Sequence, residues 1–161
     1  MDGLECELWH GTKESNVDLI CKNNLDYRLV IEQKFGKGVS FSKYFSYAFH
    51  YSVSNRPMLN KEYCVFLCKV IKNKCHIGSQ GLKYPKSGYD STMKSNEDVI
   101  VKYDDDTFYP MYKIGFTINS KNVFDNDRDF WLDDENDPEF YFGDDNDPEF
   151  YFGDSGSLEF W

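Results

Sequence analysis

ECELWHGT, the stretch from Glu5 to Thr12, carries the strongest signal for the architecture of this 161-residue chain. Its first five residues alternate polar and apolar side chains, which predicts a half-buried strand that runs into His10-Gly11-Thr12. A helix is expected to begin at Ser15, with Asp18 at the capping-box position. A histidine at a strand end is more often structural than catalytic, so its role depends on what the rest of the chain supplies.

The patterns downstream favour strands over helices. A second helix is expected over residues 43–54, after a loop at 28–37 that closes on two glycines. Three strands are expected beyond it, at Glu62–Lys72, Asp98–Tyr103 and Phe108–Ile118. Residues 73–96 read as a long polar connection. Many strands with two early helices indicate an α+β fold rather than alternating strand–helix units.

The charge divides the chain into two parts. Residues 125–161 hold 14 acidic residues and one arginine, which gives −13. Residues 1–124 hold 14 acidic and 17 basic residues, which gives +3, so the net charge of −10 describes neither part. We therefore expect a mildly basic domain at 1–124, able to host a phosphate-bearing ligand, and an acidic, aromatic-rich tail at 125–161.

The tail contains a decapeptide repeat, NDPEFYFGDD at 136–145 and NDPEFYFGDS at 146–155. Acidic residues with Pro and Gly breaks cannot bury these aromatic rings without a partner, which predicts a disordered extension. The functional alternative is a docking segment whose Phe-Tyr-Phe triplets anchor in a groove. An expanded or mistranslated terminus would have the same composition.

Hydropathy and cysteine usage favour a soluble intracellular protein. We find neither a signal-peptide pattern nor an apolar run of the roughly 20 residues that span a bilayer. The five cysteines fit neither a disulfide framework nor a zinc module, and Cys64 and Cys68 are expected to be small buried residues on one face of a strand. The three histidines are too scattered to complete a metal site, so no metal is expected, and no basic stripe predicts nucleic-acid binding.

A set of motifs occurs in a characteristic order over residues 4–118: Leu8–Thr12, Phe35–Ser42 with Ser46–Tyr51, Val65–Val70, Gly88–Thr92, and Asp98–Asp104 with Phe108–Ile114. Together they resemble the PARP catalytic domain of the ADP-ribosyltransferases. The likeness is greatest to the mono-ADP-ribosylating subgroup that includes the TCDD-inducible and zinc-finger antiviral types. The resemblance implies a split, mixed or antiparallel sheet. It also implies an N-terminally short version of the fold, with a sheet edge open to association.

This resemblance implies that NAD+ is the substrate and assigns residues to the nicotinamide pocket. Gly11 would bind the nicotinamide amide through its backbone, and Tyr51 would stack on the ring. His10 would bond the ribose hydroxyl on the nicotinamide side, and Thr12 would bond the adenosine side. Transfer in this family expels nicotinamide through an oxocarbenium-like state at the ribose.

The family's triad of His, Tyr and a variable third residue falls on His10, Ser40 and Val99. Val99 cannot bond the hydroxyl that the Glu of polymer-forming members bonds, so no chain elongation is expected; mono-ADP-ribosylating members also carry an aliphatic residue there. Ser40 removes an aromatic wall of the pocket, which costs about 0.5–1.5 kcal/mol of ring pairing and roughly 1.5–3 kcal/mol of burial. Tyr44 and Tyr47 are both candidates to fill that space.

Two functions remain open on these residues. The first is an NAD-dependent mono-ADP-ribosyltransferase that modifies the side chains of an undetermined protein acceptor. The alternative is a catalytically inactive PARP-like module that acts by binding or as a scaffold. Ala48 favours the second, because the family commonly has a serine there that bonds the nicotinamide amide.

Overall fold

The computed structural model describes residues 3–31, 34–53 and 58–119, together with the backbone of 158–160. The two-part division at residue 124 and the disordered tail predicted for 125–161 therefore lie outside the described residues, apart from the short segment at 158–160. The predicted last residue of the second helix, at position 54, also lies outside them.

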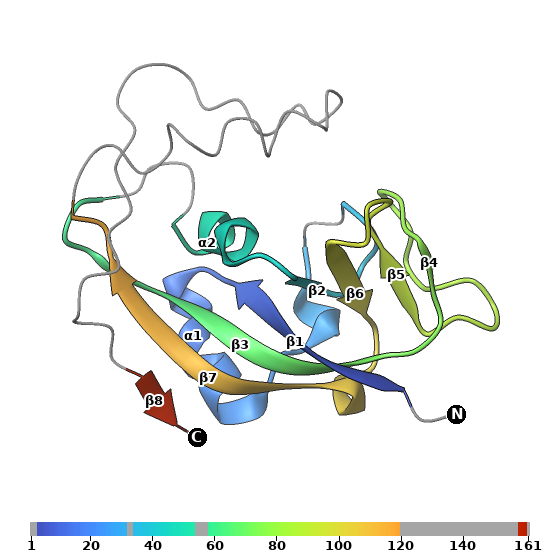
Figure 1. Ribbon diagram of the computed structural model, residues 1–161, viewed down its shortest axis with the longest axis horizontal. Coiled ribbons are helices and arrows are strands. Elements are labelled where there is room, and N and C mark those ends of the chain that lie inside the picture. The colour runs from blue at the N-terminus through green and yellow to red at the C-terminus, as the bar shows by residue number, and fades with distance from the viewer. Residues whose placement is uncertain (1–2, 32–33, 54–57, 120–157, 161) are drawn as a thin grey trace, which may run out of the picture.

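Within the described part of the chain, eight strands form one mixed sheet in the order β4-β5-β6-β2-β1-β3-β7-β8 (Figure 1). All neighbouring strands run antiparallel except β4 and β5, which are parallel. The strands are β1 (Leu4–Gly11), β2 (Val39–Ser42), β3 (Glu62–Lys72), β4 (Cys75–Ile77), β5 (Ser91–Met93), β6 (Val99–Lys102), β7 (Phe108–Thr117) and β8 (Leu158–Phe160). The predicted α+β class with a mixed sheet is confirmed.

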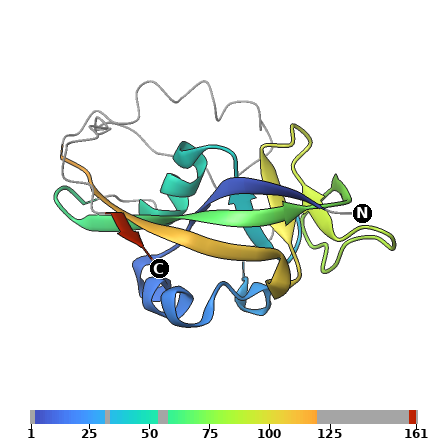
Figure 2. The same cartoon turned by 60° about the horizontal axis from the view of Figure 1, so that its bottom comes forward.

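The two helices lie on opposite faces of this sheet (Figure 2). Helix α1 (Glu14–Asn23) packs on one face, where Ile20 joins a buried cluster with Leu8, Phe66 and Phe41. Helix α2 (Phe45–Val53) covers the other face, where aromatic and aliphatic side chains gather in a second cluster: Phe49, Val53, Tyr63, Ile118, Phe45 and Phe116. The sheet is buried from both sides, as expected for a layered α+β domain.

Strand β3 contributes side chains to both clusters. Its side chains alternate, so Cys64, Phe66 and Cys68 belong to the cluster under α1, whereas Tyr63 belongs to the cluster under α2. The two cysteines do behave as small apolar residues, as predicted: Cys68 is fully buried and Cys64 is partly buried. Burial raises the pKa of the Cys64 thiol to about 12.

Two local predictions were wrong. Helix α1 begins at Glu14, not at Ser15, and the residue before it, Lys13, makes no side-chain capping bond. The polar stretch 73–96 is not a bare connection, because it contains β4 and β5. These strands have three residues each and extend the ladder that starts at β6, so their pairing depends on the adjacent strands rather than on a long pattern of their own.

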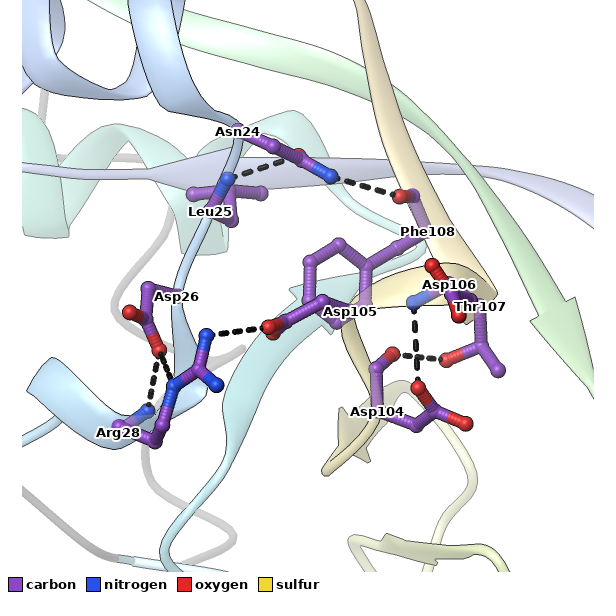
Figure 3. A network of polar contacts seen from close by, with 9 residues as sticks. All are labelled: Asn24, Leu25, Asp26, Arg28, Asp104, Asp105, Asp106, Thr107 and Phe108. Carbon is purple, nitrogen blue, oxygen red and sulfur yellow. Dashed lines mark hydrogen bonds and ion pairs between the residues drawn. The ribbon is translucent and has the colours of Figure 1, made fainter.

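Two short 3-10 turns complete the fold, at Tyr27–Leu29 and Asp105–Thr107. Figure 3 shows how polar contacts join the chain segments that contain them. The Arg28 Nε atom lies 2.7 Å from Asp26 Oδ1, and its Nη2 atom lies 2.5 Å from Asp105 Oδ2. Asn24, at the end of α1, donates from its side-chain amide to the Phe108 carbonyl oxygen at 3.3 Å. These bonds fix the loop after α1 against the start of β7.

Candidate functional site

The candidate site lies where β1 and β2 separate. Strand β1 pairs with β3 along its full length, from Leu4 opposite Lys72 to Gly11 opposite Val65. With β2, in contrast, the register in the described residues consists of one pair, Trp9 opposite Ser42. Beyond this pair β1 and β2 are not paired in the described residues, although both belong to one sheet; we call this unpaired stretch the split, and the His10-Gly11-Thr12 motif begins there.

His10 bridges the split with its side chain. Its Nδ1 atom lies 2.9 Å from the backbone carbonyl oxygen of Ser40 on β2. A carbonyl oxygen only accepts hydrogen bonds, so Nδ1 must carry the proton, and in the neutral ring Nε2 is then an acceptor. The His10 ring also packs against Phe41, with 5.7 Å between the ring centroids. The imidazole is therefore fixed in both orientation and tautomer.

The surroundings of His10 favour its neutral form. Burial lowers the pKa of His10, and the hydrogen bond to the Ser40 carbonyl opposes this shift only in part. The side chain is therefore uncharged at neutral pH. A neutral imidazole with an acceptor at Nε2 can accept a hydrogen bond from a hydroxyl group, such as one on a ribose.

Gly11 brings α2 against β1. A Cβ atom on residue 11 would lie 1.7 Å from the carbonyl oxygen of Ala48, so the helix could not take its present position over any larger residue. The absence of a side chain was predicted to permit close approach of a ligand. In the structure the space on that side of Gly11 is taken by the backbone of α2, whose side chains thereby come close to the split.

Two tyrosines of α2 form a pair on one side of the helix. Tyr47 and Tyr51 are one turn apart, their ring centroids are separated by 5.3 Å, and their hydroxyl oxygens by 3.1 Å. Tyr44 precedes the helix and is 44% exposed. Of the two residues considered for the space that Ser40 leaves, Tyr47 is the one that lies beside Tyr51.

The three positions predicted for the triad lie on three neighbouring strands. His10 on β1 and Ser40 on β2 are joined by the bond described above. On the far side of β2, Val99 of β6 lies opposite Ser42, and Val101 lies opposite Ser40. Val99 has no exposed surface. The structure thus brings His10 and Ser40 together directly and places Val99 one strand further away, as a buried apolar residue without a hydrogen-bonding group.

Thr12 connects the motif to α1. Its Oγ1 atom accepts a hydrogen bond from the Asn16 side-chain amide at 3.1 Å, so its own hydroxyl proton can be donated to another acceptor.

Sequence reasoning missed a polar group that supports the loop before β2. Thr92 Oγ1 lies 2.6 Å from the Phe35 carbonyl oxygen and 2.8 Å from the Tyr103 hydroxyl. Because the threonine proton goes to the carbonyl, the Tyr103 hydroxyl must donate to Thr92. Gly36 has a φ of +123°, and a Cβ atom there would lie 1.9 Å from the Tyr103 hydroxyl oxygen. The glycine therefore lets the loop lie directly on this pair.

A second buried polar group lies next to it on β5 and β6. Lys102 has no exposed surface, and its Nζ atom donates to Asp90 Oδ1 at 3.1 Å and to Ser91 Oγ at 2.8 Å. Burial alone would raise the pKa of the Asp90 carboxyl, but hydrogen bonds from Ser91 and Lys102 lower it overall. Sequence reasoning missed this pair as well; the signal that could have found it is a lysine that ends the apolar run Val99–Val101.

No group of three or more His, Cys, Asp or Glu side chains that could hold a metal ion occurs among the residues that the structure describes. Of the helices in that part of the chain, none has the length and apolar character required to span a membrane.

Comparison with known proteins agrees with this geometry. Residues 4–129 match the family model of the poly(ADP-ribose) polymerase catalytic domain. The human protein mono-ADP-ribosyltransferase PARP12 is 33% identical over 128 residues, which cover 73% of this chain and 18% of the human protein. Its mouse counterpart is 32% identical over 128 residues, which cover 73% of this chain and 17% of the mouse protein. This chain thus spans less than a fifth of the length of these curated relatives. The resemblance read from the motifs is confirmed, and the chain belongs to the PARP catalytic domain family.

Proposed function

We propose that this domain binds NAD+ and transfers single ADP-ribose units to protein side chains, with release of nicotinamide. The state of His10 is the observation that carries the proposal furthest. Its Nδ1 proton is bound to the Ser40 carbonyl oxygen, which leaves Nε2 as an acceptor at the split between β1 and β2. That is the group needed to hold a ribose hydroxyl beside the bond that breaks.

The chemistry explains why a neutral histidine is suitable. In the transfer, the bond between ribose C1′ and the nicotinamide nitrogen breaks, and its electron pair leaves with nicotinamide. The ribose becomes an oxocarbenium-like cation, which a nucleophile of the acceptor attacks at C1′ with loss of its proton. Burial lowers the pKa of His10, so no positive charge opposes the developing cation. The role of His10 is to orient the ribose.

Val99 supports transfer of one unit rather than polymer growth. Elongation requires a group that bonds and activates a hydroxyl of ADP-ribose already attached. Val99 is fully buried and offers no polar atom.

Tyr51 is the proposed stacking residue for nicotinamide, and we assign the second aromatic wall to Tyr47. The missing ring at Ser40 is the main argument against NAD+ binding. The Tyr47 ring lies 5.3 Å from that of Tyr51 on the same side of α2, so it adds aromatic surface beside Tyr51.

A catalytically silent binding module is the second candidate. It is favoured by Ser40 and Val99 together, because they change two of the three triad positions. Both candidates use the same fold, so they are separated by turnover and by NAD+ binding.

The test is incubation of the full chain with labelled NAD+ and a cell extract that supplies acceptors, together with thermal-shift measurements with NAD+. The transferase predicts labelling of the protein or of a partner, and His10→Ala should abolish it. His76→Ala is the matched control and should retain it, because His76 lies on β4. A blank in labelling with a retained thermal shift would support the silent module. A blank in both would reject NAD+ as the ligand.

We place this activity inside the cell. All five cysteines lie in the described residues and are free thiols, as expected in a reducing compartment. The same proposal includes three further points. The acceptor is a protein. The reaction requires no metal, and the domain makes no direct contact with a membrane or a nucleic acid.

A further inference from the structure

The far edge of the sheet is paired with a segment that is distant in sequence. Strand β7 pairs with β3 on its inner side and with β8 on its outer side (Figure 1). The outer register is antiparallel, with Tyr112 opposite Phe160, Lys113 opposite Glu159 and Ile114 opposite Leu158. The end of the acidic tail thus supplies the last strand of the sheet.

The acceptor strand has a defined window for this pairing. Between β3 and β7 the register shifts, because Leu67 lies opposite Tyr112 while Cys68 lies opposite Pro110. Met111 is therefore the extra residue of a β-bulge, which bends the strand and disrupts the ladder. Pro110 has no N–H group to donate. Both features lie next to Tyr112, which is the first residue of β7 that pairs with β8.

The tail and this window carry opposite charges. The register places Glu159 opposite Lys113, and the tail as a whole carries −13 against +3 for residues 1–124. Opposite charges on facing strands favour pairing. The Glu-Phe pair at 159–160 also recurs in the repeats, at 139–140 and 149–150, so the three pairs are ten residues apart.

We propose that the outer edge of β7 over residues 112–114 is a strand-acceptor site for the acidic-aromatic Glu-Phe unit, and that Leu158–Phe160 of the same chain occupies it. Addition of a strand to a sheet edge draws its affinity from main-chain hydrogen bonds, and alternate side chains supply specificity. The occupant also covers an edge that would otherwise be available to other chains.

The test is hydrogen–deuterium exchange of the full-length protein, read at residues 112–114. Successive N–H groups of a strand point in opposite directions, so one of the N–H groups of Glu159 and Phe160 faces β7. Proline has no N–H group, and the double change Glu159→Pro with Phe160→Pro therefore removes that donor. At least one amide at 112–114 should then exchange about tenfold faster or more. The matched control, Asn126→Pro with Asp127→Pro, alters the tail elsewhere and should leave this exchange unchanged.

A charge exchange provides an independent measurement. Lys113→Glu should accelerate exchange in the same way, and Lys113→Glu with Glu159→Lys should restore it. Unchanged exchange at 112–114 in the double-proline variant would overturn occupation by Leu158–Phe160, and unchanged exchange after the same change in all three Glu-Phe pairs would overturn the acceptor site. If the protection of the amides at 112–114 rises with protein concentration and sedimentation shows a dimer, the strand on this edge comes from a second copy of the chain. That result would overturn occupation by the same chain.

Discussion

His10 and Ser40 show how one main-chain contact can preserve part of a site while a side chain beside it is lost. The imidazole is held by the Ser40 carbonyl oxygen, 2.9 Å away, and this oxygen does not depend on the identity of residue 40. The loss that the family resemblance implies at that position is therefore limited to the aromatic wall, and the predictions at this scale concern that wall and the buried histidines.

Ser40→Tyr should strengthen NAD+ binding, because it restores a ring that contributes stacking and burial. The gain should be largest in a Tyr47→Ala background if Tyr47 now supplies the second wall. Tyr47→Ala alone should weaken binding roughly 2- to 12-fold, which corresponds to about 0.5–1.5 kcal/mol for an aromatic pair. Isothermal titration with NAD+ provides the measurement.

Tyr44→Ala is the matched control for this series, since Tyr44 is exposed and lies outside α2. It should leave the affinity unchanged. Equal losses from Tyr44→Ala and Tyr47→Ala would refute the assignment of Tyr47. No gain from Ser40→Tyr in either background would show that the defect in binding lies elsewhere.

His50 on α2 should make the protein less stable in acid. Burial lowers the pKa of His50 to about 4, whereas the unfolded side chain titrates near 6.5. Between these values the unfolded state binds a proton that the folded state does not, so stability falls as the pH decreases from about 6.5 to 4. The full effect is on the order of 3 kcal/mol.

Urea unfolding at pH 7 and pH 4.5 checks this expectation. In His50→Gln the loss of stability between the two pH values should be smaller than in the unaltered protein. Part of the loss should persist, because the pKa of His10 is also lowered. An identical loss in both proteins would exclude His50 as the source.

At the scale of elements, the position of α2 determines the site. The helix contributes both tyrosines, and it approaches β1 closely enough for Gly11 to face the Ala48 carbonyl oxygen. The geometry of the tyrosine pair therefore depends on a contact between two backbones.

Gly11→Ala should displace α2, because a backbone oxygen cannot move aside as the end of a flexible side chain can. Overpacking of this kind typically costs about 1–3 kcal/mol. Urea unfolding should show this loss, and NAD+ binding should weaken further than the loss of stability explains. Thr12→Ala, at the next residue, should change stability much less. A Gly11→Ala protein with unaltered stability and NAD+ affinity would contradict this account of the helix position.

At the scale of the whole molecule, the apolar cluster under α1 makes Cys68 a reporter of global unfolding. Cys68 is fully buried, and burial raises the pKa of both the Cys64 and the Cys68 thiols. In the native protein, a thiol reagent followed by peptide mapping should modify Cys68 only at the rate of unfolding. Cys6 and Cys64, which are both only partly buried, should react sooner. Rapid labelling of Cys68 in native buffer would show that the α1 face opens locally.

The fold could be predicted from the sequence where long local patterns exist. The eleven-residue run of β3 was predicted with its observed bounds, because its pattern is determined within the segment itself. The strands β4 and β5 were missed, since three-residue strands depend on neighbours in space. For the same reason the family resemblance could propose roles for His10 and Tyr51, whereas the sequence could not choose between Tyr44 and Tyr47. That choice depends on how α2 is oriented on the sheet.

The bond from His10 to the Ser40 main chain has a consequence for evolutionary drift. Every amino acid presents the same carbonyl group, so residue 40 can change repeatedly without disturbing the tautomer of the histidine. A lineage that loses the aromatic ring at residue 40 retains an oriented imidazole at His10. A single later substitution that restores the ring then completes the site, because the histidine is still in place. Loss of activity by this route is reversible in a way that loss of His10 is not.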